Sequence, residues 1–183
     1  MRKNYLSLFT FLLVTLLLVG CTTPRDDRIR NMSVAELIRE GQSEMQSGNY
    51  QSSIDHFSAI EARYPYSTQA EQAKLNKIYT YYLDREFDRA EAEIEAFRTL
   101  YPNHPEIAYT WYIEGIVNFD RARSILDRLM PPDRTKIDPY QMEKSLEAFL
   151  HVVEHYPQTP YAADAAQRVV YLRNTLAQSE MHI

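Results

Sequence analysis

The 183-residue sequence has one cysteine, Cys21, and four glycines. A single cysteine excludes a framework of disulfides within the chain. Glycine-rich loops that cradle phosphate groups are absent, and no serine or cysteine stands beside an obvious general base. These absences argue against nucleotide chemistry and nucleophilic catalysis. We therefore predict a protein that is not an enzyme and that needs no cofactor.

The sequence also lacks an excess of basic residues. Its formal net charge is −5, and without Arg2 and Lys3 the remaining 18 basic and 25 acidic side chains give −7. An acidic chain lacks the excess of basic side chains that binds nucleic acid, so a nucleic-acid partner is excluded. A local exception stands at Arg121, Arg123, Arg128 and Arg134, which form either a basic spot for an acidic partner or ordinary surface charge.

The only long hydrophobic run lies at the N-terminus. Arg2 and Lys3 precede an uncharged segment from Tyr5 to Val19, which is the order of a secretory signal and is shorter than the about 20 apolar residues of a membrane-spanning helix. It ends in Leu18-Val19-Gly20-Cys21, which resembles the box that lipoprotein signal peptidase cleaves. We predict a signal peptide over 1–20 and lipid attachment at Cys21; the alternatives are an ordinary signal peptide or an uncleaved anchor.

A polar segment over residues 21–32 is predicted to tether the lipid to the folded part. By analogy with other lipoproteins, Thr22 in place of aspartate means that the inner-membrane retention signal is absent. This predicts a protein anchored by its lipid to the outer membrane, on the periplasmic face.

Beyond residue 32 the apolar residues recur at intervals of three and four, which predicts an almost entirely helical chain. Three similar segments each end in a Tyr-Pro pair, at Pro65, Pro102 and Pro157. Because proline cannot continue a helix, each pair marks a helix end. Repetition at this spacing is typical of stacked helical hairpins.

The repeats resemble the tetratricopeptide motif, whose small residues match Gly41, Ser53, Ala90 and Gly115, whereas Lys74 departs from the bulky apolar residue expected there. The predicted fold is an all-α tetratricopeptide-repeat solenoid of about three and a half repeats. Its repeats cover 33–67, 68–105 and 106–159, the third stretched by an insertion of about 18 residues around 130–139 between its two helices. A final unpaired helix covers 160–183 and is either a cap or a sign that the chain is cut short.

In this motif the first helix of each repeat lines a concave groove. By resemblance, those positions hold the following residues: Gln72, Leu75, Tyr79 and Tyr82 in the second repeat, and Tyr109, Tyr112, Ile116 and Phe119 in the third. A groove with aromatic rings suits an extended peptide that itself carries aromatic residues. We predict that Tyr79, Tyr82, Tyr109, Tyr112 and Phe119 bind a peptide or partner; the alternative is that some of these rings only pack the helices together.

One pattern points to metal chemistry. His151-Val152-Val153-Glu154-His155 matches the inverted zinc-protease pattern H-x-x-E-H. The repeat register already explains these positions, no third protein ligand is evident, and the helix is ending there. We predict no catalytic and no metal site, and at most adventitious metal binding.

The lipobox, the polar tether, the early Gly-Asn-Tyr hairpin, the Tyr-Pro ends and the stretched third repeat occur in an order that resembles the BamD (ComL, YfiO-like) family of β-barrel assembly lipoproteins. The resemblance implies a scaffold at the inner face of the outer membrane. Its implied partners are a POTRA domain of the central barrel subunit, other assembly lipoproteins and unfolded outer-membrane proteins with aromatic-rich signals. Family members carry about five repeats, so this chain looks C-terminally shortened. The alternative is a tetratricopeptide lipoprotein for cell-wall or Tol-Pal-type envelope work.

Overall fold

The computed structural model describes residues 24–123 and 138–180, with side chains described over 28–123 and 138–178. The predicted signal peptide, Cys21, Arg128 and Arg134 lie outside the described residues, as does most of the predicted insertion.

The described residues form helices and no strands, which confirms the all-α prediction. The helices are α2 (Pro24–Asn31), α3 (Val34–Gln46), α4 (Tyr50–Arg63), α5 (Thr68–Leu83), α6 (Phe87–Leu100), α7 (Ile107–Ala122), α8 (Pro139–His155) and α9 (Ala162–Glu180). Within the described ranges none of them is long and apolar enough to cross a membrane.

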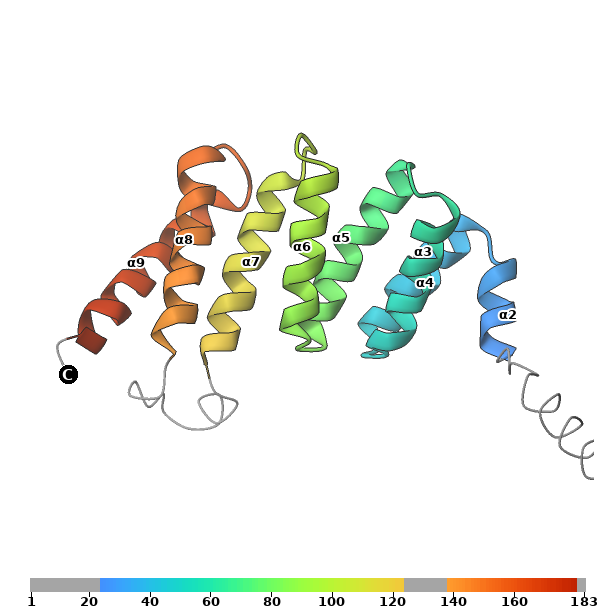
Figure 1. The fold of residues 1–183 in the computed structure, drawn as a ribbon, viewed down its shortest axis with the longest axis horizontal. Coiled ribbons are helices and arrows are strands. Elements are labelled where there is room, and N and C mark those ends of the chain that lie inside the picture. Colours follow the sequence, from blue (N-terminus) through green and yellow to red (C-terminus); the bar gives the residue numbers. More distant parts are fainter. Residues whose placement is uncertain (1–23, 124–137, 181–183) are drawn as a thin grey trace, which may run out of the picture. The chain divides into compact units, whose positions relative to one another are not determined.

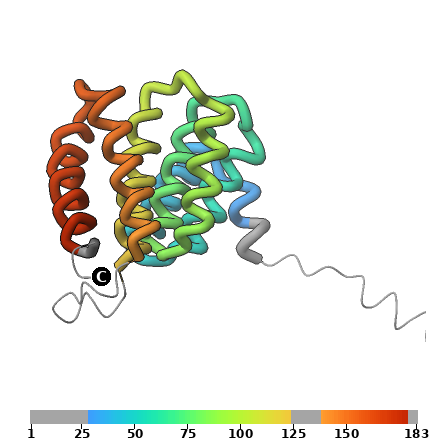
Figure 2. The backbone as a smooth tube through the Cα atoms, turned by 60° about the vertical axis from the view of Figure 1, so that its left-hand side comes forward, coloured from blue at the N-terminus to red at the C-terminus, as the bar shows by residue number. Residues whose placement is uncertain are grey.

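Two compact units divide the chain, residues 1–33 and residues 34–183. The first contains α2, a short polar helix inside the segment predicted as a tether. In the second unit, Figure 1 and Figure 2 show helices α3 to α9 following one another in chain order. Consecutive helices pack together as the hairpins α3–α4, α5–α6 and α7–α8, and α9 packs against α8. The helices α3 to α8 thus fall two by two within the predicted repeats, and α9 falls within 160–183.

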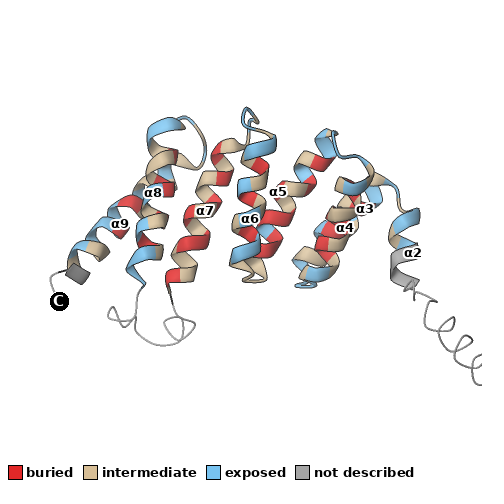
Figure 3. Ribbon diagram, viewed as in Figure 1, coloured by how far each residue is buried: buried red, intermediate tan, exposed pale blue. Residues whose placement is uncertain are grey.

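Small residues allow the two helices of a hairpin to approach closely. A Cβ atom added to Gly115 of α7 would lie 2.6 Å from the Phe149 ring of α8, and one added to Gly41 would lie 2.9 Å from the Phe57 ring. Phe57, Phe149 and the equivalent Phe97 of α6 are fully buried. Figure 3 shows the buried residues along the facing sides of the helices. The glycines are therefore required by packing.

The Tyr-Pro pairs end α4, α6 and α8 as predicted. At each end the tyrosine N–H donates the last helical hydrogen bond, for example from Tyr64 to the Ile60 carbonyl at 2.9 Å, and proline follows. The next helix begins a few residues later, at Thr68, Ile107 and Ala162. At the first of these starts, the Ser67 hydroxyl caps α5 by accepting from the Ala70 N–H at 3.1 Å. These turns set the register in which α5, α7 and α9 present their side chains.

Candidate functional site

The five predicted groove residues lie on two helices, Tyr79 and Tyr82 on α5 and Tyr109, Tyr112 and Phe119 on α7. Tyr79 is 39% exposed, and the other four are partly buried. Two separate hollows open among them, and each also takes residues from α9 or from the turn before it.

 The first hollow, here called the tyrosine hollow, has a volume of about 330 Å³. Seven residues line it: Gln72, Leu75, Asn76, Tyr79, Glu106, Tyr109 and Tyr161. The rings of Tyr109 and Tyr161 have centroids 5.7 Å apart, and the Tyr161 hydroxyl donates to Glu106 Oε2 at 2.9 Å.

The phenols of Tyr109 and Tyr161 stay protonated at neutral pH. Burial raises the pKa of Tyr109 well above its ordinary value, and the neighbouring phenols and Glu106 raise it further. Burial, followed by the hydrogen bond to Glu106, raises the pKa of Tyr161 to about 12. The tyrosine hollow therefore offers neutral rings and amides, with one carboxylate at its edge.

Tyr82 differs from the predicted groove residues that line a hollow. Its ring lies between those of Tyr79 and Phe87, with centroids 6.0 and 6.4 Å away, and its hydroxyl donates to Asp120 Oδ2 of α7 at 2.9 Å. It lines neither of the two hollows. In this structure Tyr82 joins α5 to α7.

Tyr112 lies between the two hollows. Its ring stacks on that of Tyr161 with centroids 5.3 Å apart, and its hydroxyl donates to Asp164 Oδ2 at 2.8 Å. Asp164 also accepts a short hydrogen bond from Arg168. Burial alone would raise the pKa of Asp164, but the hydrogen bonds from Arg168 and Tyr112 outweigh burial and hold that pKa below its ordinary value. Asp164 is therefore charged and fixed at neutral pH.

The second hollow, here called the arginine hollow, has a volume of about 450 Å³ and is lined by Phe119, Arg123, Asp164, Gln167, Arg168 and Tyr171. The rings of Phe119 and Tyr171 meet edge to face with centroids 5.8 Å apart. The guanidinium carbons of Arg123 and Arg168 lie 5.4 and 5.9 Å from the centre of the Phe119 ring. Two cations thus flank one ring at this end of the groove.

Arg121 and Arg123 belong to the arginine group that the sequence left as either a basic spot or ordinary surface charge, and the structure gives them different surroundings. Arg121 forms ion pairs with Asp88 at 3.1 Å and Glu91 at 2.8 Å, so its charge is neutralised by α6. Arg123 instead lines the arginine hollow. The structure therefore separates two arginines that the sequence places side by side.

Sequence reasoning missed what α9 brings to this surface. Tyr161, Asp164, Arg168 and Tyr171 all contribute, but the repeat register marks α9 only as a final unpaired helix. Reading Tyr161 and Tyr171 by the same spacing as Tyr109 and Phe119, ten residues apart in both cases, is the signal that would have found them.

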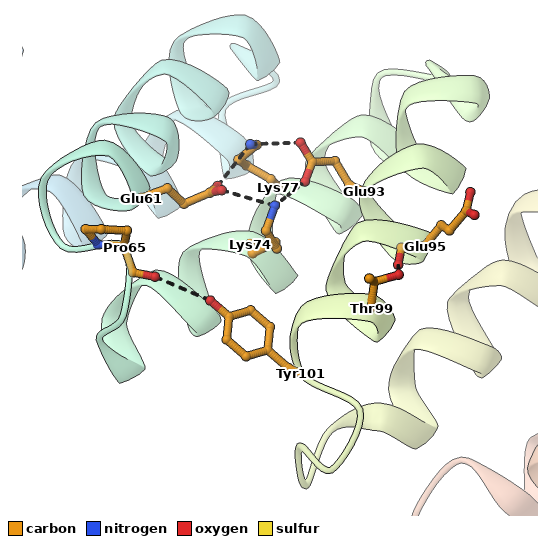
Figure 4. Close-up of polar contacts among 8 residues, drawn as sticks. All are labelled: Glu61, Pro65, Lys74, Lys77, Glu93, Glu95, Thr99 and Tyr101. Carbon is orange, nitrogen blue, oxygen red and sulfur yellow. Dashed lines mark hydrogen bonds and ion pairs between the residues drawn. The ribbon is translucent and has the colours of Figure 1, made fainter.

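A second missed feature lies on the other side of α5. Lys74 and Lys77 form four ion pairs with Glu61 of α4 and Glu93 of α6, at distances of 2.7 to 3.2 Å (Figure 4). Lys74 departs from the apolar pattern because two carboxylates surround it. This four-residue network joins three consecutive helices.

The H-x-x-E-H segment has its own packing explanation. The His151 ring stacks on His155 at a centroid distance of 4.1 Å and lies 3.8 Å from the Trp111 ring, over which Arg98 sits at 3.5 Å. Burial, then the charges of His155 and Arg98, lowers the pKa of His151. Across the described residues, no cluster of three or more potential metal ligands includes these histidines.

Comparison with known proteins gives consistent matches. A family model described as "Outer membrane lipoprotein", YfiO, matches residues 30–183. The outer membrane protein assembly factor BamD of Neisseria gonorrhoeae is 35% identical over 184 residues, which cover 100% of this chain and 69% of that protein. The BamD proteins of Vibrio cholerae and Haemophilus influenzae are 31% and 28% identical, covering 93% and 100% of this chain and 70% and 69% of their own lengths.

Proposed function

We propose that this chain, which belongs to the YfiO family of outer membrane lipoproteins, is a scaffold of the β-barrel assembly machinery that binds other proteins. Its matched relatives are named outer membrane protein assembly factors. The observation that carries the proposal is the aromatic surface shared by α5, α7 and α9, since rings bury much area at low entropic cost and suit protein ligands. The role is one of binding rather than catalysis.

The proposed setting is the periplasmic face of the outer membrane. Cys21 would carry the lipid, and a protein with several acyl chains stays on a membrane more stably than one with a single chain. The proposed partners are a POTRA domain of the central barrel subunit, other assembly lipoproteins and unfolded outer-membrane proteins. The match of the whole chain to assembly factors supports this set over cell-wall or Tol-Pal-type envelope partners.

Within this role, the groove is proposed to bind unfolded clients. Tyr79, Tyr109 and Phe119 line the hollows, so they would contact the client directly. Tyr82 and Tyr112 use their hydroxyls to hold α5 against α7 and α7 against α9, so they would position the surface. The helices α5, α7 and α9 would thereby act as one binding face.

A pull-down from gently solubilised native membranes tests the scaffold role. The tagged full-length protein is expected to co-purify with the central barrel subunit. A Cys21→Ser variant is expected to be missing from the membrane fraction. Recovery of only cell-wall or Tol-Pal-type proteins would favour the envelope alternative instead.

A peptide-binding measurement tests the groove. Tyr79→Ala is expected to weaken binding of an aromatic client peptide several-fold, because its ring lines the tyrosine hollow and is partly exposed. Tyr66→Ala serves as the control, since Tyr66 is 97% exposed and lines neither hollow. Equal losses in both variants, or none in either, would remove the groove from the proposal.

A further inference from the structure

The tyrosine hollow and the arginine hollow are both lined by residues of α7 or its ends and of the segment 161–171. Tyr112 joins them, because it stacks on Tyr161 of the first hollow and donates a hydrogen bond to Asp164 of the second. Along α7 the same face carries Tyr109 at one end and Phe119 with Arg123 at the other. A ligand that lies along α7 would meet both hollows.

The two ends differ in charge. Arg123 has no carboxylate within 4.0 Å among the described residues, whereas Arg168 is paired with Asp164. The described lining of the arginine hollow therefore has two arginines against one carboxylate, in a chain whose net charge is −5. The tyrosine hollow has the opposite character, since Glu106 lines it and no lysine or arginine does.

We propose that the arginine hollow binds a carboxylate of an extended peptide whose aromatic side chain occupies the tyrosine hollow, and this inference rests on the proposed client-binding role of the groove. Arg123 would supply the charge-assisted hydrogen bonds to the carboxylate, which are stronger than neutral ones. The Phe119 and Tyr171 rings would border that contact. Glu106 would repel a carboxylate at the other end, so the charge difference also sets the direction of the peptide.

The tyrosine hollow holds a further feature that suits a peptide. The Nδ2 amide of Asn76 is buried and has no hydrogen-bond acceptor. A buried donor without an acceptor carries a desolvation cost. A backbone carbonyl entering this hollow would remove that cost after a small rotation of the Asn76 side chain.

The geometry also fixes the spacing of the two peptide groups. Tyr109 and Phe119 are ten residues apart on one helix, which corresponds to about 15 Å at about 1.5 Å per residue. An extended peptide rises about 3.3 Å per residue, so about four to five residues span this distance. In an extended chain, residues separated by an even number point to the same face. The aromatic residue and the carboxylate are thus expected at positions i and i+4.

Fluorescence anisotropy with labelled peptides and the full-length protein tests this arrangement. The first peptide has an aromatic residue at i and glutamate at i+4 with a blocked C-terminus. The second has glutamine at i+4, the third has glutamate at i+1, and the fourth ends at i+4 with a free carboxylate in place of the glutamate side chain. We expect the first or the fourth peptide to bind about tenfold more tightly than the second and third.

Variants then assign the contact to Arg123. Arg123→Gln is expected to remove this preference, and Arg123→Glu is expected to favour a peptide with lysine at i+4. Arg173→Gln is the matched control, because it removes one positive charge from an exposed position of α9 that lines neither hollow. Preference for the first peptide assigns the site to acidic side chains, and preference for the fourth assigns it to the chain end.

The outcomes separate this inference from the function on which it rests. Equal binding of all four peptides, still weakened by Tyr79→Ala, would overturn the carboxylate site and leave the client groove standing. If Arg173→Gln reduced the preference for peptides with a carboxylate at i+4 as much as Arg123→Gln does, the carboxylate site at Arg123 would also be overturned. Arg123-dependent binding to vesicles containing anionic lipid, without any peptide preference, would replace the peptide by a lipid headgroup.

Discussion

Replacing Lys77 by methionine tests how far the four-residue network of Lys74, Lys77, Glu61 and Glu93 stabilises the stack. Lys77 Nζ lies 2.9 Å from a carboxylate oxygen of both Glu61 and Glu93, and its side chain is only 9% exposed. The methionine would fill a similar volume but would remove two of the four ion pairs. It would also leave two carboxylates, each 21% exposed, to share Lys74.

The size of the effect follows from this burial. Removing one partner of a buried ion pair costs about 3–5 kcal/mol, chiefly because the other charge is left uncompensated. Lys74 remains and the carboxylates keep some contact with water, so we expect Lys77→Met to lower the free energy of unfolding by about 2 kcal/mol. Lys74→Met, at a position that is 12% exposed, is expected to cost somewhat less.

Urea unfolding at pH 7, followed by far-ultraviolet circular dichroism, measures this change. Glu61→Gln made in the Lys77→Met background should cost less than Glu61→Gln made in the wild type, because one of the two lysine partners of Glu61 is already absent. Equal costs in the two backgrounds would show that these charges are not coupled. A Lys77→Met protein as stable as the wild type would refute the reasoning directly.

Three further predictions follow from the same structure. The stability difference between wild type and Lys77→Met should shrink as the pH falls below about 4.5, the ordinary pKa of a glutamate. Burial alone would raise the pKa of Glu93, but the hydrogen bonds and charges of the two lysines outweigh burial and lower that pKa. The stabilisation from the ion pairs is therefore present above pH 4.5 and lost on acidification, which unfolding measured at a series of acid pH values would show. Gly115→Ala should lower the midpoint of thermal unfolding, because the added methyl group would clash with the Phe149 ring. Such overpacking costs about 1–3 kcal/mol, whereas alanine gains about 1 kcal/mol over glycine in helix propensity. An unchanged midpoint would mean that the two helices of this hairpin can move apart. His151 should titrate by NMR with a midpoint below 6.5, and His155→Ala should raise that midpoint by removing the nearby charge.

The fold follows closely from the sequence because its signals are local. Each Tyr-Pro pair ends a helix by removing the next backbone donor, whatever the rest of the chain does. The small residues at Gly41 and Gly115 mark where a second helix must approach, and both meet a phenylalanine ring there. Fold class and hairpin order could therefore be predicted without any knowledge of distant contacts.

The candidate site depends on contacts that the sequence does not record. Tyr112 and Asp164 are 52 residues apart in sequence, and Tyr161 and Glu106 are 55 residues apart, yet each pair forms a hydrogen bond. A repeat register places each helix in its own unit, so it predicts which residues face the groove but not which of them bond to one another. For that reason Tyr82 and Tyr112 looked equivalent to Tyr79 until their partners were known.

Helix α5 shows why structural and binding roles can be separated by mutation. Lys74 and Lys77 turn toward α4 and α6, where carboxylates hold them, whereas Gln72, Asn76 and Tyr79 line the tyrosine hollow. These positions alternate along the sequence, and the 3.6-residue period of the helix sorts them onto different sides. A change at Lys77 should therefore alter the free energy of unfolding more than the affinity for peptide, and a change at Tyr79 should do the reverse. If both substitutions altered both quantities in proportion, the groove would form only as the hairpins lock together, and client binding would itself stabilise the stack.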